Sequence, residues 1–122
     1  MKTDDVIMNK EKEEDRTDTM ENETKNWLVI NLKDPVTYQG ETITVIDLTK
    51  ITELTGTDLN TIYDLYYDLG GQRTVMQEIT LLFAQIVASK VTGRPVEVLE
   101  RLKARDSMNL KNRVYRFFFL EE

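Results

Sequence analysis

The hydrophobic period of this chain changes near Thr55, and this change restricts the fold more than any other feature of the sequence. Before that point, Leu28, Ile30 and Leu32 alternate with their neighbours at a period of two, and residues 42–48 are rich in β-branched side chains. Both patterns are typical of strands. After that point, apolar residues recur at the three- and four-residue spacing of helices. Strands and helices in separate blocks predict an α+β domain.

Turn signals within the first block predict a short antiparallel hairpin. Residues 34–35 (Asp-Pro) interrupt the first strand, because proline cannot donate a hydrogen bond to a sheet. A second extended stretch covers residues 36–38, and residues 39–41 (Gln-Gly-Glu) form a turn signal. We therefore expect two or three short strands, with the chain reversing near the glycine of that turn.

About four α-helices are expected to follow the hairpin. Thr57 suits the N-cap position of the first helix, and residues 70–71 (Gly-Gly) end it. The second helix is expected to run from about Arg73 to Lys90, and Gly93 closes it. This second helix is predicted to be the most buried element, because it has a broad apolar face made of Val75, Met76, Ile79, Leu82, Phe83, Ile86 and Val87.

Two shorter helical patterns complete the domain. Pro95 suits the first position of a third helix, in which Val96, Leu99 and Leu102 would form the buried stripe. Either Asp106 or Ser107 could cap the fourth helix. That last helix would carry Leu110, Val114, Phe117 and Phe118 towards the core.

The chain divides into a charged N-terminal tail, residues 1–26, and a single domain, residues 27–122. The tail has no aromatic residue and carries nine acids and five bases. Such a segment buries too little apolar area to offset the entropy of ordering it, so we predict disorder there. Order is expected to begin at Trp27.

Composition argues against most kinds of catalysis. The sequence contains no histidine and no cysteine, which removes the usual general base, the commonest metal ligand and any thiolate chemistry. We therefore expect no enzyme activity, no cofactor and no metal site. The net charge is −6, and no apolar stretch is long enough to span a bilayer or to act as a signal peptide. The chain is expected to stay in the cytosol of the cell that makes it.

Two groups of aromatic residues are candidates for contact with a partner protein. Three tyrosines lie within one turn of the first helix and cannot all face one core, and an apolar run lies close to the end of the sequence. We expect some of Tyr67, Phe119 and Leu120 to be exposed. The candidate partner-binding residues are Tyr63, Tyr66, Tyr67, Phe117, Phe118, Phe119 and Leu120.

Nucleic acid is a less favoured partner. Residues 94–116 carry seven bases against three acids, so this end of the domain has the charge to touch phosphate. The acid excess elsewhere opposes that reading, and so do Asp58, Asp64 and Asp68 beside the tyrosines. A solvated helix surface is the preferred explanation of the basic residues.

Several short motifs in a fixed order give the chain a family resemblance over about residues 27–119. The chain resembles the small tail assembly chaperones of long-tailed bacteriophages, in the group that includes the gene product E and gene 41 types. The motifs are Leu32-Lys33-Asp34-Pro35 through Gly40, the β-rich Thr42 to Leu48, Leu54-Thr55-Gly56-Thr57-Asp58-Leu59, Thr92-Gly93-Arg94-Pro95 before Val98-Leu99-Glu100-Arg101-Leu102, and a last helix from Asp106 to Val114-Tyr115-Arg116-Phe117-Phe118. The charged N-terminal tail is longer than the N-terminal segment expected for this family.

The resemblance implies a function in binding rather than in catalysis. Proteins of this kind bind the tape measure protein, keep that helical molecule soluble, help to recruit tail tube protein around it, and are generally absent from the finished virion. The resemblance therefore implies action in the cytoplasm of a bacterial host. The sequence leaves the oligomeric state open.

In many members of this family a programmed ribosomal frameshift makes a second, C-terminally extended product. Phe-Phe-Leu within residues 117–120 can be encoded by a uridine-rich slippery run, although these residues are equally well explained as part of a helix. Two alternative functions remain: a structural tail or neck component of the virion, and a small nucleic-acid-binding regulator that uses the basic C-terminal helices.

Overall fold

The computed structural model describes residues 27–121, and these form a two-stranded antiparallel sheet followed by helices. This confirms the α+β class. The segment predicted to be disordered, residues 1–26, lies outside the described residues. The elements in chain order are β1 (Val29–Tyr38), β2 (Glu41–Asp47), the 3₁₀ helix η1 (Thr49–Glu53), α2 (Gly56–Asp68), the 3₁₀ helix η2 (Gln77–Ile79), α3 (Leu81–Thr92), α4 (Val96–Glu100) and α5 (Ala104–Phe119).

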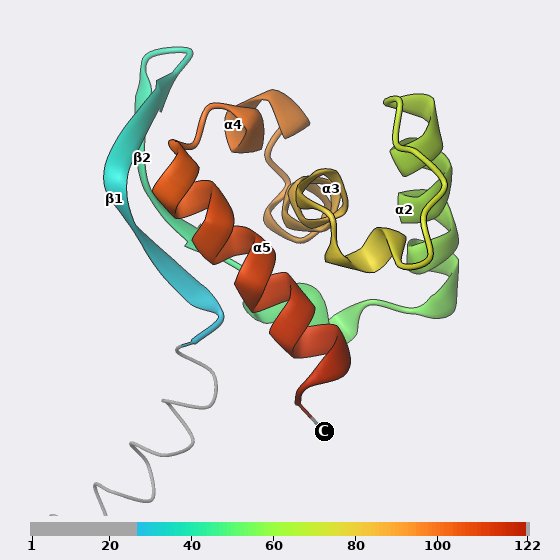
Figure 1. Cartoon of the computed structure of the whole chain (residues 1–122). Helices are drawn as coiled ribbons and strands as arrows, with labels where there is room; N and C mark the ends of the chain where they lie inside the picture. The colour runs from blue at the N-terminus through green and yellow to red at the C-terminus, as the bar shows by residue number, and fades with distance from the viewer. Residues whose placement is uncertain (1–26, 122) are drawn as a thin grey trace, which may run out of the picture.

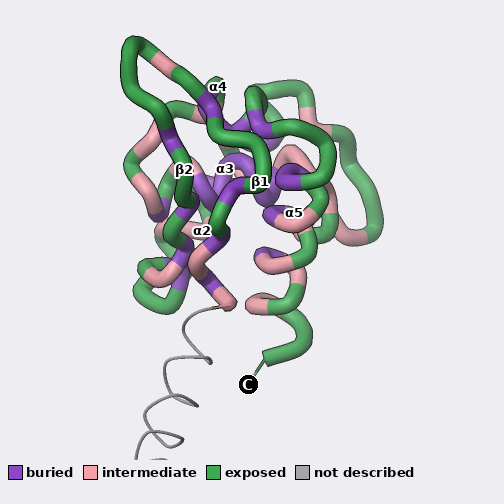
Figure 2. The backbone as a smooth tube through the Cα atoms, turned by 90° about the vertical axis from the view of Figure 1, so that its left-hand side faces the viewer, coloured by how far each residue is buried: buried purple, intermediate pink, exposed green. Residues whose placement is uncertain are grey.

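Helix α3 is the centre of the fold. Figure 1 views it nearly end-on, with the hairpin, η1, α2, α4 and α5 arranged around it. Residues 83–88 of α3 are all buried, which confirms the prediction that this helix is the most covered element. In Figure 2 the buried positions of the other elements lie mainly on the sides that face this central helix. Among residues 27–121, no helix is long and apolar enough to cross a membrane.

The hairpin closes at the predicted turn. Tyr38 pairs with Glu41, so the loop consists of Gln39 and Gly40 alone, and both have positive φ angles, 49° and 80°. Two such residues fit the tight turn whose twist matches that of the paired strands. The alternation at Leu28, Ile30 and Leu32 is also confirmed, because all three side chains are buried.

The Asp-Pro interruption appears as a bulge within β1 rather than as a break between two strands. The register shifts between Asn31 and Val36, so that residues 32–35 lie opposite Thr44 alone. The amide groups of Lys33 and Asp34 at this bulge donate to the carboxylate of Asp106, each at 3.0 Å. A side chain of α5 therefore replaces the missing strand partner.

The N-cap of the first helix lies two residues earlier in the chain than predicted. Thr55, not Thr57, is the N-cap of α2, and it forms a capping box with Asp58 in which each side chain bonds the backbone of the other residue. This reciprocal arrangement satisfies two amide groups that a helix start leaves without partners. The helix ends before Gly70, which has a φ of 92°, as predicted.

The predicted helix from Arg73 to Lys90 is wrong in its first eight residues. Residues 73–80 form an irregular loop with the short helix η2, and α3 begins only at Leu81. Thr80 sets this start, because its hydroxyl accepts the amide of Phe83 at 3.2 Å. Gly93 closes the helix with a φ of 74°, as expected.

The last two helices also begin at positions that differ from the predictions. Pro95 is the N-cap of α4 rather than its first residue, and Lys103 is the N-cap of α5. Asp106 and Ser107 therefore lie inside α5, buried, instead of capping it. The Ser107 hydroxyl donates to the carbonyl of Leu102 at 3.0 Å, which ties α5 back to the end of α4.

Candidate protein-binding site

Exposed apolar side chains gather in two regions of the described chain. The first lies around the end of α2 and the loop that follows, and we call it the α2–α3 patch: Tyr67, Leu69, Val75 and Ile79, with exposed fractions of 41%, 47%, 101% and 42%. The second is the α5 tip: Phe119 and Leu120, at 42% and 63%. Tyr67, Phe119 and Leu120 are thus exposed, as the sequence led us to expect.

The half-buried aromatic residues among the candidates form a continuous chain through the core. Tyr63 of α2 packs against Phe83 of α3 at a ring separation of 5.6 Å, and Phe83 meets Phe118 of α5 edge to face at 6.0 Å. Phe117 packs edge to face on Phe118 at 5.2 Å. These contacts hold three helices together, so Tyr63, Phe117 and Phe118 serve the fold and present only part of their surface to solvent.

Tyr66 is removed from the surface altogether. Its side chain is 2% exposed, and its hydroxyl donates to the carbonyl of Gln72 at 2.8 Å. Gly71 lies directly against the Tyr66 ring: a Cβ atom added at Gly71 would be 2.4 Å from that ring. Tyr66 therefore anchors the loop after α2 and is not available to a partner in this conformation.

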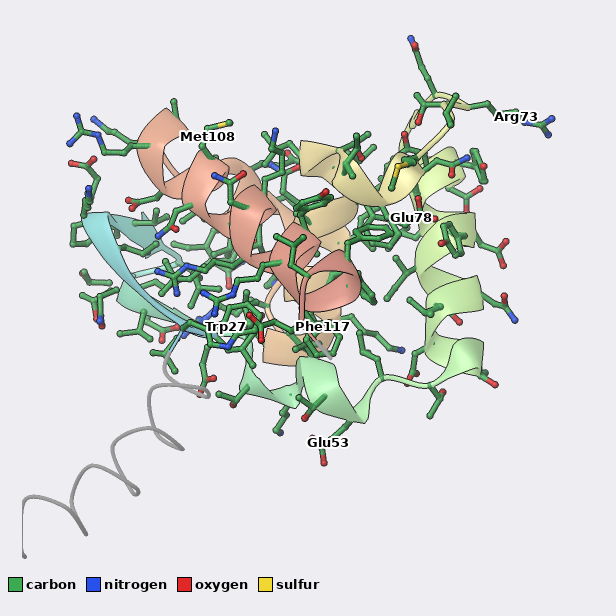
Figure 3. All side chains as sticks on the ribbon, turned by 60° about the horizontal axis from the view of Figure 1, so that its bottom comes forward. Trp27, Glu53, Arg73, Glu78, Met108 and Phe117 are labelled. Atoms are coloured by element: carbon green, nitrogen blue, oxygen red, sulfur yellow. The ribbon has the colours of Figure 1, made fainter. Side chains whose placement is uncertain are left out.

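Two further tyrosine contacts hold the same loop against α2. The Tyr63 hydroxyl donates to the carboxylate of Glu78, and Gln77 donates through Nε2 to the Tyr67 hydroxyl at 2.7 Å. Burial, followed by the hydrogen bond and negative charge of Glu78, raises the pKa of Tyr63 to about 12. Figure 3 shows Glu78 on the α2 side of the molecule and Arg73 pointing away from it. The loop is thereby fixed in a shape that leaves its valine and isoleucine uncovered.

Sequence reasoning missed three of the four patch residues. The apolar spacing predicts Val75 and Ile79 on the buried face of a helix, and Leu69 is not among the candidate binding residues. The signal that could have found the loop is Thr80, a favoured N-cap residue directly before the apolar run that starts at Leu81. If the helix starts at that point, Val75 and Ile79 precede it and do not belong to its buried face.

Arginine side chains of the basic C-terminal region mostly bond other parts of the protein. The Arg94 guanidinium pairs with both carboxylate oxygens of Glu41, at 3.1 and 3.2 Å. Arg101 lies over the ring of Tyr38 at 5.1 Å and donates to the carbonyl of Thr37 at 3.1 Å. These side chains therefore have intramolecular roles that would compete with phosphate.

The two arginines nearest the end of α5 are engaged with the start of β1. Arg116 lies 4.3 Å from the ring centre of Trp27 and pairs with Glu121 at 2.5 Å. Arg113 donates to the Trp27 carbonyl and to Asn109. Burial, and then the adjacent charge of Arg116, lower the pKa of Arg113. This arrangement favours the structural reading of the basic residues over a nucleic-acid surface.

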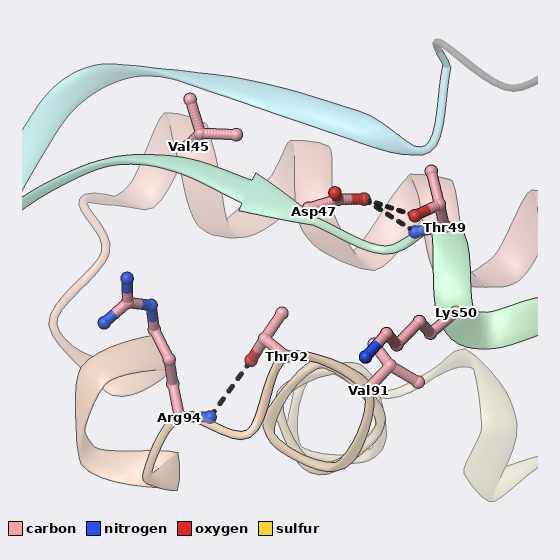
Figure 4. A pocket seen from close by; sticks show the side chains of 7 residues that line it. All are labelled: Val45, Asp47, Thr49, Lys50, Val91, Thr92 and Arg94. Carbon is pink, nitrogen blue, oxygen red and sulfur yellow. Dashed lines mark hydrogen bonds between the residues drawn. The ribbon is translucent and has the colours of Figure 1, made fainter.

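A polar groove between β2 and the end of α3 also proves to be structural (Figure 4). It has a volume of about 240 Å³ and is lined by Val45, Asp47, Thr49, Lys50, Val91, Thr92 and Arg94. The Asp47 carboxylate accepts from both the hydroxyl and the amide of Thr49, which lowers the pKa of Asp47. The Asp47 carboxylate therefore stabilises the turn between β2 and η1. Within residues 27–121 no group of acids is arranged to hold a metal ion.

Comparison with protein families gave a match over most of the described chain. A protein-family model described as "Phage tail assembly chaperone proteins, E, or 41 or 14" matches residues 29–118, which covers the whole hairpin and nearly all of the helical region. No curated protein and no solved structure matches the chain significantly.

Proposed function

The chain belongs to the family of phage tail assembly chaperones, and we propose that it binds the tape measure protein, keeps it soluble and helps to recruit tail tube protein. The family match over residues 29–118 carries this proposal. It is supported by a well-packed core that nevertheless leaves two apolar regions open to solvent. A chaperone of this kind needs uncovered apolar surface for its client and net charge to keep the complex soluble.

The proposed contact residues are the exposed members of the aromatic candidates, Tyr67, Phe119 and Leu120. The ring of Phe119 packs in a tilted arrangement against that of Tyr115 at 5.2 Å, so the α5 tip offers a supported aromatic surface rather than a single isolated side chain. Aromatic anchors commonly carry most of the energy of such interfaces. Tyr63, Phe117 and Phe118 would support this surface from beneath.

We further propose that the protein acts in the cytoplasm of the bacterial host, is left out of the mature virion and does no catalysis. A frameshifted, extended form would continue from Glu121, which is exposed beyond the last turn of α5. Sequencing the gene tests that part: a slippery run over residues 117–120 with an overlapping downstream frame is expected, and its absence removes the extended form from the proposal.

Co-expression with the tape measure protein tests the main function. We expect the wild-type chain to keep the tape measure protein in the soluble fraction, and Tyr67→Asp or Phe119→Asp to reduce that fraction without unfolding the domain. Asn112→Asp is the matched control, because it adds the same charge at an exposed position of α5. If the wild-type chain gives no increase in soluble tape measure protein, the proposed function is wrong.

Mass spectrometry of purified virions separates this function from the structural alternative. A chaperone that leaves the assembly is expected to be missing from the particles. Its presence in stoichiometric amount would show instead a tail or neck component.

A further inference from the structure

We propose that the α2–α3 patch binds an amphipathic helix whose apolar stripe is flanked by lysine and arginine residues. This inference rests on the proposed function, because it names the surface and the type of client segment that a helical tail protein would supply. The patch consists of residues other than those of the α5 tip, and the sequence predicted two of its four residues, Val75 and Ile79, on the buried face of a helix.

The patch has the shape and character of a docking surface. Val75 is fully exposed, and it lines an open apolar groove of about 350 Å³ together with Thr74, Met76, Ile79 and Thr80. Single exposed apolar side chains are normal on protein surfaces, but contiguous groups mark interaction sites. Half of the eight large apolar side chains exposed within residues 27–121 fall between Tyr67 and Ile79.

The loop that carries the patch is held in place before any partner binds. Its start is fixed by the Tyr66–Gln72 hydrogen bond, and its end by Thr80, whose hydroxyl donates to the Gln77 carbonyl at 2.7 Å. Between these points, Gln77 and Glu78 bond the tyrosines of α2. A surface fixed in this way loses little conformational entropy when it binds, which favours affinity.

The partner segment is expected to be helical. Only β1 and β2 are paired as a sheet in the described chain, and the patch is built from the end of α2, the loop and η2. An extended peptide would find no strand edge there for its backbone groups, whereas a helix satisfies its own. A helix also presents apolar side chains at three- and four-residue spacing, which can fill a short groove.

The charge around the patch selects basic flanks. Residues 64–80 contain three acids, Asp64, Asp68 and Glu78, and one base, Arg73. Glu78 accepts the hydrogen bond of the Tyr63 hydroxyl. Asp64 and Asp68 are exposed on α2, one turn before Tyr67 and directly after it, and we infer that they form the charged rim of the interface. Complementary charge at an interface rim raises the association rate and rejects partners of like charge. The same acids make a self-paired dimer through this face unfavourable, because each rim would meet its own copy.

Binding of designed helical peptides to the full-length protein tests the inference without the phage client. One peptide carries an apolar stripe with lysine and arginine flanks, and the other carries the same stripe with glutamate flanks. We expect the basic peptide to bind roughly tenfold more tightly at low salt, and we expect that preference to shrink as salt screens the rim charges. In nuclear magnetic resonance spectra, the amide signals of residues 67–79 should shift.

Matched variants locate the site. Val75→Asp and Ile79→Asp are each expected to weaken binding of the basic peptide by roughly tenfold. Val45→Asp, which changes an exposed valine on β2, should leave binding unchanged. The double variant Asp64→Asn with Asp68→Asn should reduce the preference for the basic peptide.

Several results overturn the inference. The inference is wrong if the basic peptide does not bind or if both peptides bind equally. It is also wrong if the amide signals that shift belong only to other elements, or if Val75→Asp acts only by breaking a dimer of the chain. If the basic peptide binds at the patch while the tape measure protein stays insoluble, the surface stands and the proposed function fails. If the wild type and Val75→Asp solubilise the tape measure protein equally and no peptide binds, the function stands and the inference fails.

Discussion

Replacing Asp106 with asparagine should destabilise the domain, because this change removes one of the two hydrogen bonds that join α5 to the bulge of β1. The Asp106 side chain is 1% exposed, and its two carboxylate oxygens each accept one amide of the β1 bulge, from Lys33 and from Asp34, at 3.0 Å. Asparagine keeps one accepting oxygen and replaces the other with an NH₂ group, which places a donor against a donor. One amide of the bulge then loses its partner.

The expected loss follows from these two contacts. A hydrogen bond to a charged group contributes about 1.5–3 kcal/mol, and an unpaired buried donor costs about 1–3 kcal/mol. The bulge lies partly at the surface, since Lys33 and Asp34 are themselves exposed, so water can reach the freed amide. We therefore expect Asp106→Asn to lower the free energy of unfolding by about 2 kcal/mol. Asp106→Ala, which removes both acceptors, should lower it by about 3 kcal/mol.

Urea unfolding followed by far-ultraviolet circular dichroism measures this loss at neutral pH. Glu100→Gln is the matched control, because it neutralises an exposed acid on α4, and it should change the free energy of unfolding by less than about 0.5 kcal/mol. A value for Asp106→Asn as small as the control would show that the carboxylate does not hold the bulge, and the link between α5 and β1 would need another cause.

Three further substitutions test the packing around the aromatic chain. Gly71→Ala should cost about 1–3 kcal/mol in urea unfolding, because the new Cβ would lie 2.4 Å from the buried Tyr66 ring. Phe83→Ala removes a fully buried ring, so a loss of about 3–5 kcal/mol and a lower melting temperature are expected. The folded pKa of Tyr63, about 12, exceeds its value of 10.0 in the unfolded chain. The contribution of protonated Tyr63 to the free energy of unfolding is therefore complete below pH 10 and is lost as the pH rises through 12. Tyr63→Phe, which also frees Glu78, should flatten stability measured across that window.

The sequence predicted the hairpin turn and the end of the central helix correctly, because short-range patterns determine both. Alternating apolar residues set which face of β1 is buried, and the Gln39-Gly40 pair sets where the chain turns. Gly93 ends α3 because a glycine readily takes the left-handed conformation observed there. In each case the deciding residues lie within a few positions of the feature they control.

Asp106 shows where that reasoning stops. Its sequence context, an aspartate near the start of a helix, suggested a cap. The carboxylate instead bonds amides more than seventy residues earlier in the chain. No local pattern contains that information, because these amides and the carboxylate meet only when β1 and α5 pack together.

The loop before α3 was mispredicted for a related reason, and the error concerns the candidate site. Val75 and Ile79 continue the apolar spacing of α3 towards its N-terminus, so periodicity alone extends the helix through them. Three tyrosine hydrogen bonds from α2 hold the loop in another conformation. Local apolar pattern and tertiary hydrogen bonding therefore disagree at this segment, and the hydrogen bonding determines the structure.

That disagreement has a consequence for function. Burial of apolar surface contributes about 25 cal/mol for each Å² removed from water. A loop that leaves Val75 and Ile79 exposed lacks this contribution to stability. A longer helix would recover it only if these two side chains then met a core surface. The hairpin, α2, α4 and α5 already pack around α3 and bury its residues 83–88. Val75 and Ile79 are thus available to the basic helix that we propose as a partner, and its binding would bury apolar area that the packing of residues 27–121 leaves exposed.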